Sequence, residues 1–400
     1  MERRLIRKTR GLCPSCLAET DAELYSEGGR ALIEKTCPVH GRSQDVADPD
    51  AELYLRCASG RANRPSRYGL VIPVSYACDL SCRWCYLPER GREFAVDSIK
   101  AMIASSPARH IVFSGGEPCL RRELPELITH VRRAHPEKRS VLLTNGLRLA
   151  DPSFAALLKE SGLDYCILSL NGFRPATHEF FNGRDLSAEK AAALRNLKRL
   201  EIKTILSMTL ARGVNEDELA AVVRFGLGNM DFVRQLRLRN VSDIGVHSPR
   251  ERIYMSDMLR LASSATGFTL EEMFGENAVS NRRGATVNYF VMNVFNLLRR
   301  RARTAAAPGP AFWLAAASRA GLAGALRMAL EPELPPEERT TFNLEIFSWP
   351  TAGGADLEEI RKFPIGHVSN KGEALPFWEA LFSNDRERLR AAKDGRPSIP

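Results

Sequence analysis

From residue 70 onward, the chain alternates short apolar runs, rich in Val, Ile and Leu, with amphipathic segments. In the amphipathic segments the apolar residues recur at helical spacing, as in Leu124, Leu127, Ile128 and Val131. This alternation is typical of βα units built on a parallel sheet. We expect strands over residues 70–76, 111–114, 140–144, 165–170, 204–210 and 232–238. We expect helices over residues 96–105, 123–134, 151–159, 187–200 and 216–225.

The pattern changes on both sides of this repeat. Before it, residues 31–35 indicate a short strand after the Gly28-Gly29 turn, and the polar residues 48–65 indicate a linker. After it, we expect helices over residues 256–265, 287–298 and 311–330 and a strand over residues 342–349. The sequence therefore predicts an α/β core between a small N-terminal segment and a mixed α+β C-terminal region.

Composition is that of a globular chain with a substantial core, because 44% of the 400 residues are hydrophobic and 26% are charged. The first eight residues lack the apolar stretch of a signal peptide. Nine cysteines, several at metal-type spacing, favour a reducing cytoplasm over a disulfide framework. The net charge of +9 and pI near 9.2 favour a polyanionic partner such as phospholipid head groups, a phosphorylated substrate or nucleic acid. An arginine-rich chain from a GC-rich genome explains the same charge equally well.

Three cysteines follow the first expected strand at CxxxCxxC spacing: Cys78, Cys82 and Cys85. Three thiolates on one short loop can hold three corners of a four-iron cluster and leave the fourth iron open to another ligand. A tetrahedral zinc site more often shows paired CxxC knuckles and a visible fourth ligand. We therefore predict a [4Fe-4S] cluster on this loop, and three unrelated core thiols are the alternative.

The second expected strand leads into Gly115-Gly116-Glu117-Pro118. Adjacent glycines let the backbone turn tightly and approach a ligand closely, and the Glu117 carboxylate suits a cationic amine. In this order behind the cysteine triplet, the motif resembles the radical SAM superfamily, with Trp84 at that family's aromatic position. The resemblance covers residues 68–243.

This resemblance implies an open, partial (β/α)6 barrel with its chemistry at the carboxyl ends of the strands. It implies a [4Fe-4S] cluster held by the catalytic cysteines, S-adenosylmethionine as cofactor, and a low-potential electron donor of the ferredoxin or flavodoxin type. Residues 178–184 stand where relatives carry a substrate-side loop. The residues expected to bind S-adenosylmethionine are Gly115, Gly116, Glu117 and Pro118 at the methionine end, Ser169 and Asn171 at its carboxylate or ribose, and Trp84 and Tyr86 near the adenine.

A second set of metal-type residues precedes the core, where Cys13 and Cys16 form a CxxC and Cys37 and His40 form a CxxH. Two facing knuckles supply four ligands that suit zinc or a mononuclear iron, and a segment this short gains stability from a metal. Cys57 is an alternative fourth ligand, which would give a rubredoxin-like iron site. A knuckle of this kind before a radical SAM core is similar to the archaeal tetraether-lipid synthases and the related methylases that act on pterin cofactors.

These features divide the chain into a metal-binding knuckle at residues 1–62, a radical SAM core at 63–250 and a substrate or lid domain at 251–400. In the last domain, the apolar run at 287–298 leads into the basic run at 299–303. This combination suits a helix at an anionic membrane interface or a lid over a greasy substrate, and two ordinary buried helices are the alternative.

The expected activity is reductive cleavage of S-adenosylmethionine to a 5′-deoxyadenosyl radical that activates an unreactive C–H bond. The expected outcome is C–C bond formation or methylation of a hydrophobic or lipid-like substrate, in the cytoplasm or at the inner face of the membrane. The alternatives are a pterin-cofactor methylase, a peptide-modifying enzyme, and an Fe–S protein that binds nucleic acid. Nucleic acid is disfavoured because a structural cluster has no need of the amine-binding carboxylate at Glu117.

Overall fold

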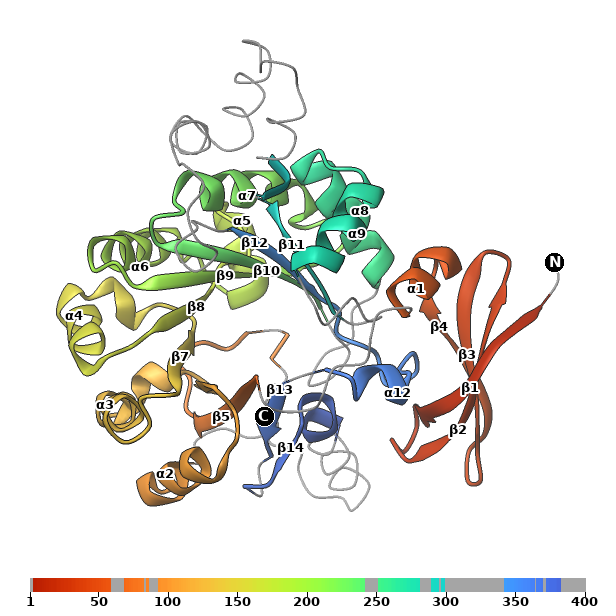
Figure 1. Ribbon diagram of the computed structural model, residues 1–400, viewed down its shortest axis with the longest axis horizontal. Helices are drawn as coiled ribbons and strands as arrows, with labels where there is room; N and C mark the ends of the chain where they lie inside the picture. The colour runs from red at the N-terminus through yellow and green to blue at the C-terminus, as the bar shows by residue number, and fades with distance from the viewer. Residues whose placement is uncertain are drawn as a thin grey trace, which may run out of the picture.

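The computed structural model describes residues 3–58, 68–82, 84–85, 93–241, 251–280, 289–294, 296–298, 342–363, 365–369 and 372–382. Within these residues the chain forms a four-stranded N-terminal sheet and a curved ten-stranded sheet with helices along its outer side (Figure 1). The α/β class, the partial parallel barrel and the small N-terminal unit agree with the sequence prediction.

The N-terminal sheet is an antiparallel meander in the order β1-β2-β3-β4. Its strands are β1 (Arg4–Leu12), β2 (Glu19–Glu27), β3 (Arg30–Cys37) and β4 (Gly41–Asp48). Hairpin strands of this kind need a covered face to be stable. Leu24 and Ile33 on that face are fully buried.

A short helix, α1 (Ala51–Ala58), covers this face, although the sequence indicated a linker there. The linker prediction is wrong for residues 51–58 because Ala51, Tyr54 and Cys57 share one buried face. Asp50 begins the helix by accepting a hydrogen bond from the Leu53 amide at 2.9 Å.

The core consists of six consecutive parallel strands, as predicted. They are β5 (Gly69–Ser75), β6 (His110–Gly115), β7 (Arg139–Thr144), β8 (Tyr165–Ser169), β9 (Lys203–Leu210) and β10 (Val233–Asn240). The helices between them are α2 (Val96–Ser105), α3 (Leu124–Ala134), α4 (Pro152–Ser161), α5 (Pro175–Asn182), α6 (Ser187–Arg199) and α7 (Leu219–Gly228). Asp151 caps α4 as expected, accepting from the Ser153 amide at 2.9 Å.

The C-terminal part of the chain extends both edges of the same sheet. After α8 (Met255–Thr266) and α9 (Leu270–Ser280), the strand β12 (Asn343–Phe347) pairs parallel with β10. The short helix α12 (Leu357–Ile360) then leads to β13 (Ile365–Val368), which pairs parallel with β5 at the other edge. The outermost strands, β11 (Tyr289–Asn293) and β14 (Ala374–Pro376), pair antiparallel. Among the described residues, eight parallel strands therefore surround the interior. The boundary between the core and the C-terminal domain at residue 250 remains a prediction.

The helix expected over residues 287–298 is wrong for residues 289–293, which form β11, while residues 294 and 296–298 are helical. Phe290 and Met292 alternate toward the core and pair with Ile346 and Leu344 of β12, a partner that lies some fifty residues away in the sequence. The expected helix over residues 311–330 and the basic run at 299–303 lie outside the described residues. In the described part of the chain, every helix is too short or too polar to cross a bilayer.

Aromatic residues from the C-terminal segment fill the interior of the curved sheet. Phe347, Phe363 and Trp378 pack there, with the Phe347 and Phe363 rings stacked at a centroid distance of 4.5 Å. The inner faces of β5 and β6 contribute Val71 and Val112 to the same cluster. The C-terminal chain therefore supplies the core of the barrel and holds its strand ends in place.

Candidate active site and metal knuckle

The carboxyl ends of the parallel strands and the loops that follow them surround one cavity. Strand ends at this edge carry the catalytic residues in barrels built from βα units. The residues lining the cavity are Cys78, Leu80, Cys82, Trp84, Cys85, Ser114, Gly115, Gly116, Leu143, Thr144, Asn145, Ser169, Asn171, Phe181, Asn182, Thr209, Arg239, Asn240, Val241 and Trp349.

The three predicted cluster cysteines all line this cavity. Asn182 of α5 donates a hydrogen bond from Nδ2 to the Cys82 thiol at 3.3 Å. Burial raises the pKa of the Cys78 thiol to about 11, so a bound cation such as iron is needed to hold it as a thiolate at neutral pH. Three soft donors that line one cavity would hold three irons of a [4Fe-4S] cluster, and its fourth iron would be left for another ligand.

The glycine turn is locked against the strand that leads into the cysteine loop. The Gly116 amide donates to the Ser75 carbonyl and the Glu117 amide donates to the Ala77 carbonyl, both at 2.8 Å. Gly115 adopts φ +125°, and a Cβ there would lie far inside van der Waals contact of the Ser75 carbonyl oxygen. The two glycines therefore let β6 approach β5 closely, directly before Cys78.

Glu117 lies beneath the cavity wall, with 1% of its surface exposed. Its Oε1 accepts from the Cys119 amide at 3.0 Å and from Thr144 Oγ1 at 2.7 Å, and its Oε2 accepts from the Asn145 amide at 2.7 Å. Burial raises the pKa of this carboxyl, against the opposing effect of the three donors. In this structure Glu117 fixes the end of β7, and its expected contact with a methionine amine stays a prediction.

The end of β7 is also tied to the cysteine loop and to α6. Asn145 donates from Nδ2 to Asp79 Oδ1 at 2.7 Å. Lys190 of α6 is buried and donates from Nζ to the carbonyl oxygens of Asn145 and of Ser169, the latter at 2.6 Å. Burial lowers the pKa of Lys190 to about 8. The sequence analysis missed Lys190, because a lysine within an amphipathic helix usually faces solvent.

The other predicted cofactor residues divide into three groups. Ser169, Asn171 and Trp84 line the cavity, and Trp84 packs beside Phe180 of α5 at a centroid distance of 6.0 Å. Pro118 is buried next to the cavity without lining it. Tyr86 lies outside the described residues. The roles assigned to these residues therefore remain predictions.

Of residues 178–184, expected near the substrate, residues 178–182 form the end of α5 and Gly183 caps it. Phe181 and Asn182 line the cavity from this helix end. Thr209 and Arg239 complete the wall from β9 and β10, where Arg239 Nε donates to Thr209 Oγ1 at 2.8 Å. Trp349 reaches the cavity from the loop after β12. No local motif marks Trp349, so its place in the site follows from the pairing of β12 with β10.

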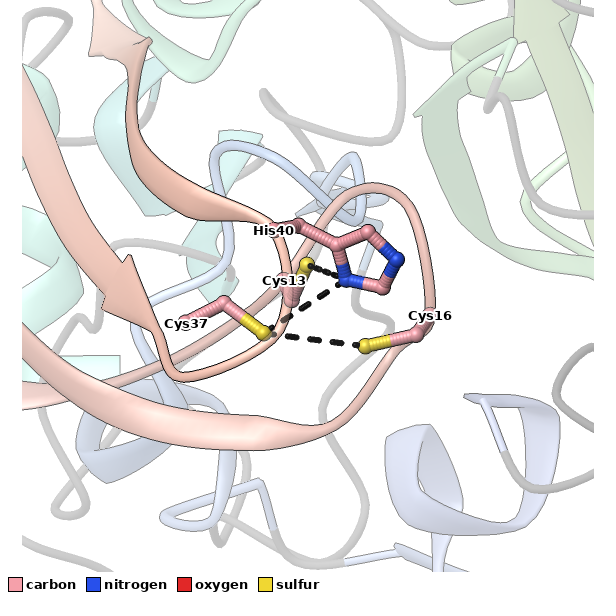
Figure 2. Close-up of side chains that lie close together, drawn as sticks. All are labelled: Cys13, Cys16, Cys37 and His40. Atoms are coloured by element: carbon pink, nitrogen blue, oxygen red, sulfur yellow. Dashed lines mark hydrogen bonds between the residues drawn. The ribbon is translucent and has the colours of Figure 1, made fainter.

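The N-terminal knuckle brings its four predicted ligand residues together: Cys13, Cys16, Cys37 and His40 point toward one another in Figure 2. Their ligand atoms all lie within 4.8 Å of one another. Cys13 Sγ and Cys37 Sγ each lie 3.5 Å from His40 Nδ1, and Cys16 Sγ lies 4.0 Å from Cys37 Sγ. A zinc ion with Zn–S of about 2.3 Å and Zn–N of about 2.0 Å places tetrahedral ligands roughly 3.5–3.8 Å apart. The donor set therefore fits zinc.

Cys37 and Cys57 differ in how readily their thiols form the thiolate that a metal needs. Backbone amides of Val39 and His40 donate to the Cys37 thiol and lower its pKa to about 6, which favours the thiolate that a metal needs. Cys57 is buried in α1 among Leu24, Ile33 and Tyr54, and burial raises the pKa of its thiol. The alternative ligand set with Cys57 is therefore not the arrangement in this structure.

A parallel partial barrel, a three-cysteine loop on its cavity and a glycine turn behind that loop together define a radical SAM domain. Comparison with protein families agrees: residues 72–226 match the model of the Radical SAM superfamily, and residues 5–48 match the HMPTM N-terminal zinc ribbon domain. We therefore assign the core to the radical SAM superfamily and the knuckle to this type of zinc ribbon.

Two curated relatives and one solved structure illustrate the similarity. The 7,8-dihydro-6-hydroxymethylpterin dimethyltransferase of Methanocaldococcus jannaschii is 29% identical over 310 residues, which cover 67% of this chain and 60% of that protein. The Fe-coproporphyrin III synthase of Methanosarcina barkeri is 38% identical over 143 residues, which cover 33% of this chain and 34% of that protein. The crystal structure of Streptococcus suis SuiB bound to S-adenosylmethionine aligns with a TM-score of 0.44 and 16% identity, covering 55% of this chain and 49% of that one. The matched region thus spans less than two thirds of each of these proteins.

Proposed function

We propose that this protein is a radical SAM enzyme that methylates a pterin-type substrate with two molecules of S-adenosylmethionine and two electrons from the reductant. One S-adenosylmethionine is cleaved reductively to the radical that takes a hydrogen atom from the pterin, and the second gives its methyl group to the reduced pterin radical and leaves as S-adenosylhomocysteine. The observation that carries the reaction class is the placement of Cys78, Cys82 and Cys85 on the wall of one cavity, next to the Gly115-Gly116 turn. When bound, the cluster supplies one electron that splits S-adenosylmethionine into methionine and a 5′-deoxyadenosyl radical able to take a hydrogen atom from carbon.

The residues of this chain supply positioning for that chemistry. The Glu117 network and Lys190 hold the ends of β7 and β8, so Asn145, Ser169 and Asn171 line the cavity from fixed strand ends. Trp84, Phe181 and Trp349 are apolar walls that exclude water from the reacting centre.

The pterin assignment is supported by the knuckle and by the long match to the M. jannaschii protein. Residues 5–48 match a zinc ribbon named after that kind of enzyme, and the match to the dimethyltransferase extends over 310 residues. The expectation of a lipid-like substrate rests on the resemblance to the tetraether-lipid synthases and on the apolar run at 287–298, and residues 289–293 of that run form a strand of the core sheet. A lipid substrate and contact with a membrane therefore become alternatives that the assay below decides.

The test is anaerobic turnover of the reconstituted protein with S-adenosylmethionine, a low-potential reductant and 7,8-dihydro-6-hydroxymethylpterin. We expect 5′-deoxyadenosine formation that rises when the pterin is added, together with a methylated pterin detected by mass spectrometry. Parallel reactions contain a total lipid extract in place of the pterin. Stimulation by lipid with unchanged pterin would contradict the pterin assignment, and absence of 5′-deoxyadenosine in every reaction would contradict the reaction class.

A further inference from the structure

Trp349 lines the cavity, and the loop that follows it contacts the N-terminal ribbon (β1–β4). It is buried, lines the cavity together with the cysteine loop, and follows β12 directly. Asn240 at the end of β10 fixes its backbone, because Asn240 Oδ1 accepts from the Trp349 amide at 2.6 Å and Asn240 Nδ2 donates to the Trp349 carbonyl at 3.1 Å. The position of the indole in the cavity therefore depends on how this loop is held.

The loop from residue 350 to residue 356 is held by the ribbon. Lys35 of β3 donates from Nζ to the Gly353 carbonyl, and Gly354 lies so close to Val46 of β4 that a Cβ there would approach the Val46 carbonyl oxygen to 2.9 Å. Arg252, beside the loop, makes an ion pair with Asp45 of β4 at 3.0 Å.

The far end of the loop is anchored in the same unit. Asp356, only 2% exposed, accepts from Thr9 Oγ1 at 2.6 Å and from the Tyr54 hydroxyl at 3.2 Å, and it pairs with Arg7. Glu359 of α12 pairs with the same arginine at 2.9 Å. Separating Asp356 from these partners would leave a buried carboxylate unpaired and would strongly destabilise the folded state. The loop and the ribbon therefore keep one relative position.

The lysine of this contact connects the loop to the metal knuckle. Lys35 is 1% exposed, and its side chain crosses Gly11 so closely that a Cβ at Gly11 would meet the lysine stem. Gly11 stands two residues before Cys13, and Cys37 stands two residues after Lys35. The strands that present the knuckle are therefore the strands that present the lysine to Gly353.

We propose that the ribbon is a positioning element for substrate, and that it acts by holding Trp349 as the wall against which a flat heteroaromatic substrate stacks. The proposal rests on the function proposed above, and it assigns to the knuckle a role in substrate affinity in addition to stability. Trp349 turns the small exposed part of its indole to the cavity, and Trp378 packs edge-on against the ring at a centroid distance of 5.2 Å. Arg239 offers a polar group on the same cavity. Trp349 is then a specificity residue, and Lys35 is a positioning residue that acts through it.

The experiment compares four variants in the metal-loaded full-length protein: Trp349→Ala, Trp349→Phe, Lys35→Met and the control Arg42→Met. Arg42 lies on the same ribbon, but its ion pair with Glu34 is on the exposed surface. With 7,8-dihydro-6-hydroxymethylpterin, we expect Trp349→Ala to raise the pterin KM by about tenfold and Trp349→Phe to restore most of the affinity. Lys35→Met should raise the same KM by a smaller factor. Lys35→Met and Arg42→Met should keep the wild-type KM for S-adenosylmethionine, and all four variants should keep the wild-type iron and zinc content.

Hydrogen exchange provides a readout that needs no substrate. In Lys35→Met, amides of residues 351–356 should exchange faster than in the wild type and in Arg42→Met, because the loop has lost its ribbon contact. Unchanged exchange in Lys35→Met, or an unchanged pterin KM in Trp349→Ala, would overturn the proposal. Equal losses in the affinities for pterin and for S-adenosylmethionine would also overturn it, because they indicate general damage. Wild-type protein that cleaves S-adenosylmethionine without using the pterin would contradict the proposed function instead, and the exchange result would still decide the role of the ribbon.

Discussion

The knuckle of residues 13–40 and the loop of residues 78–85 are both cysteine sites, and they differ in how completely the protein surrounds the metal position. In the knuckle, four donor atoms converge within 4.8 Å of one another. In the loop, three thiols line a cavity that is also lined by Thr209, Arg239 and Trp349. A closed donor set is typical of a structural metal, and an open one leaves room for a reacting ligand. The comparison therefore indicates that the knuckle is a structural metal site and the cysteine loop is a reaction centre.

The largest expected effect is at the open site. Cys85→Ala should reduce 5′-deoxyadenosine formation to the background of the uncatalysed reaction, because two thiolates cannot hold the cluster in place. The measurement is chromatographic quantitation of 5′-deoxyadenosine, together with iron analysis of the reconstituted protein.

The matched control for this prediction is Cys57→Ala, which removes a buried thiol of the ribbon unit and should cost about 1–2 kcal/mol of stability through a small cavity. This control should keep its iron and its activity. Activity in Cys85→Ala near that of Cys57→Ala would show that the loop does not hold the cluster.

In the knuckle, loss of a ligand should change the stability of the N-terminal sheet and leave the cluster in place. Cys16→Ser should lose zinc and loosen residues 3–48, because binding of a structural zinc contributes on the order of 10 kcal/mol to the folding of such small units. Zinc analysis and hydrogen exchange of the ribbon amides measure this loss.

In the same variant, substrate-independent cleavage of S-adenosylmethionine should persist, since the cluster loop belongs to the other sheet. Ser15→Ala, an exposed change on the same turn, serves as the control and should keep its zinc. Complete loss of iron from Cys16→Ser would contradict the separation of the two sites.

Substitution of Gly115 tests how far the cluster loop depends on the backbone turn beside it. Gly115→Ala should cost about 3 kcal/mol, because the new methyl group is forced against the Ser75 carbonyl and φ is +125°. Gly183→Ala is the control: its φ is +81° but the space around it is open, so about 1 kcal/mol is expected.

Urea denaturation followed by circular dichroism compares these two variants. Gly115→Ala should also bind less iron, because the turn holds the strand that leads into Cys78, while its zinc content stays at the wild-type value. Equal unfolding midpoints for Gly115→Ala and Gly183→Ala would contradict the close approach of β6 to β5.

The smallest expected effect is on the reduction potential of the open site. Asn182→Leu removes the hydrogen bond to the Cys82 thiol, and a cluster with fewer donors to its sulfurs has a more negative potential. An anaerobic redox titration followed by electron paramagnetic resonance measures this shift. Glu179→Gln, on an exposed position of the same helix, should leave the potential unchanged. A potential that responds to Glu179→Gln and not to Asn182→Leu would show that the hydrogen bond is unimportant.

The sequence alone determined the features that are local in the chain. The period of the apolar residues predicted the six parallel strands and the helices between them other than α5, because burial on one face imposes that period directly. The cysteine spacings predicted both sites because each set is local in the chain. Cys78, Cys82 and Cys85 lie on one loop after β5, and the knuckle residues lie on the turns after β1 and at the end of β3.

Tertiary structure decided whatever depends on partners far apart in the sequence. Residues 289–293 became a strand because β12 offered them an edge, and Trp349 became a cavity wall because that same strand joined β10. The burial of Lys190 and Lys35 follows from carbonyl groups that other segments bring to them. Contacts of this kind leave no periodic mark on the sequence, because their free energy arises between segments that meet when the chain folds.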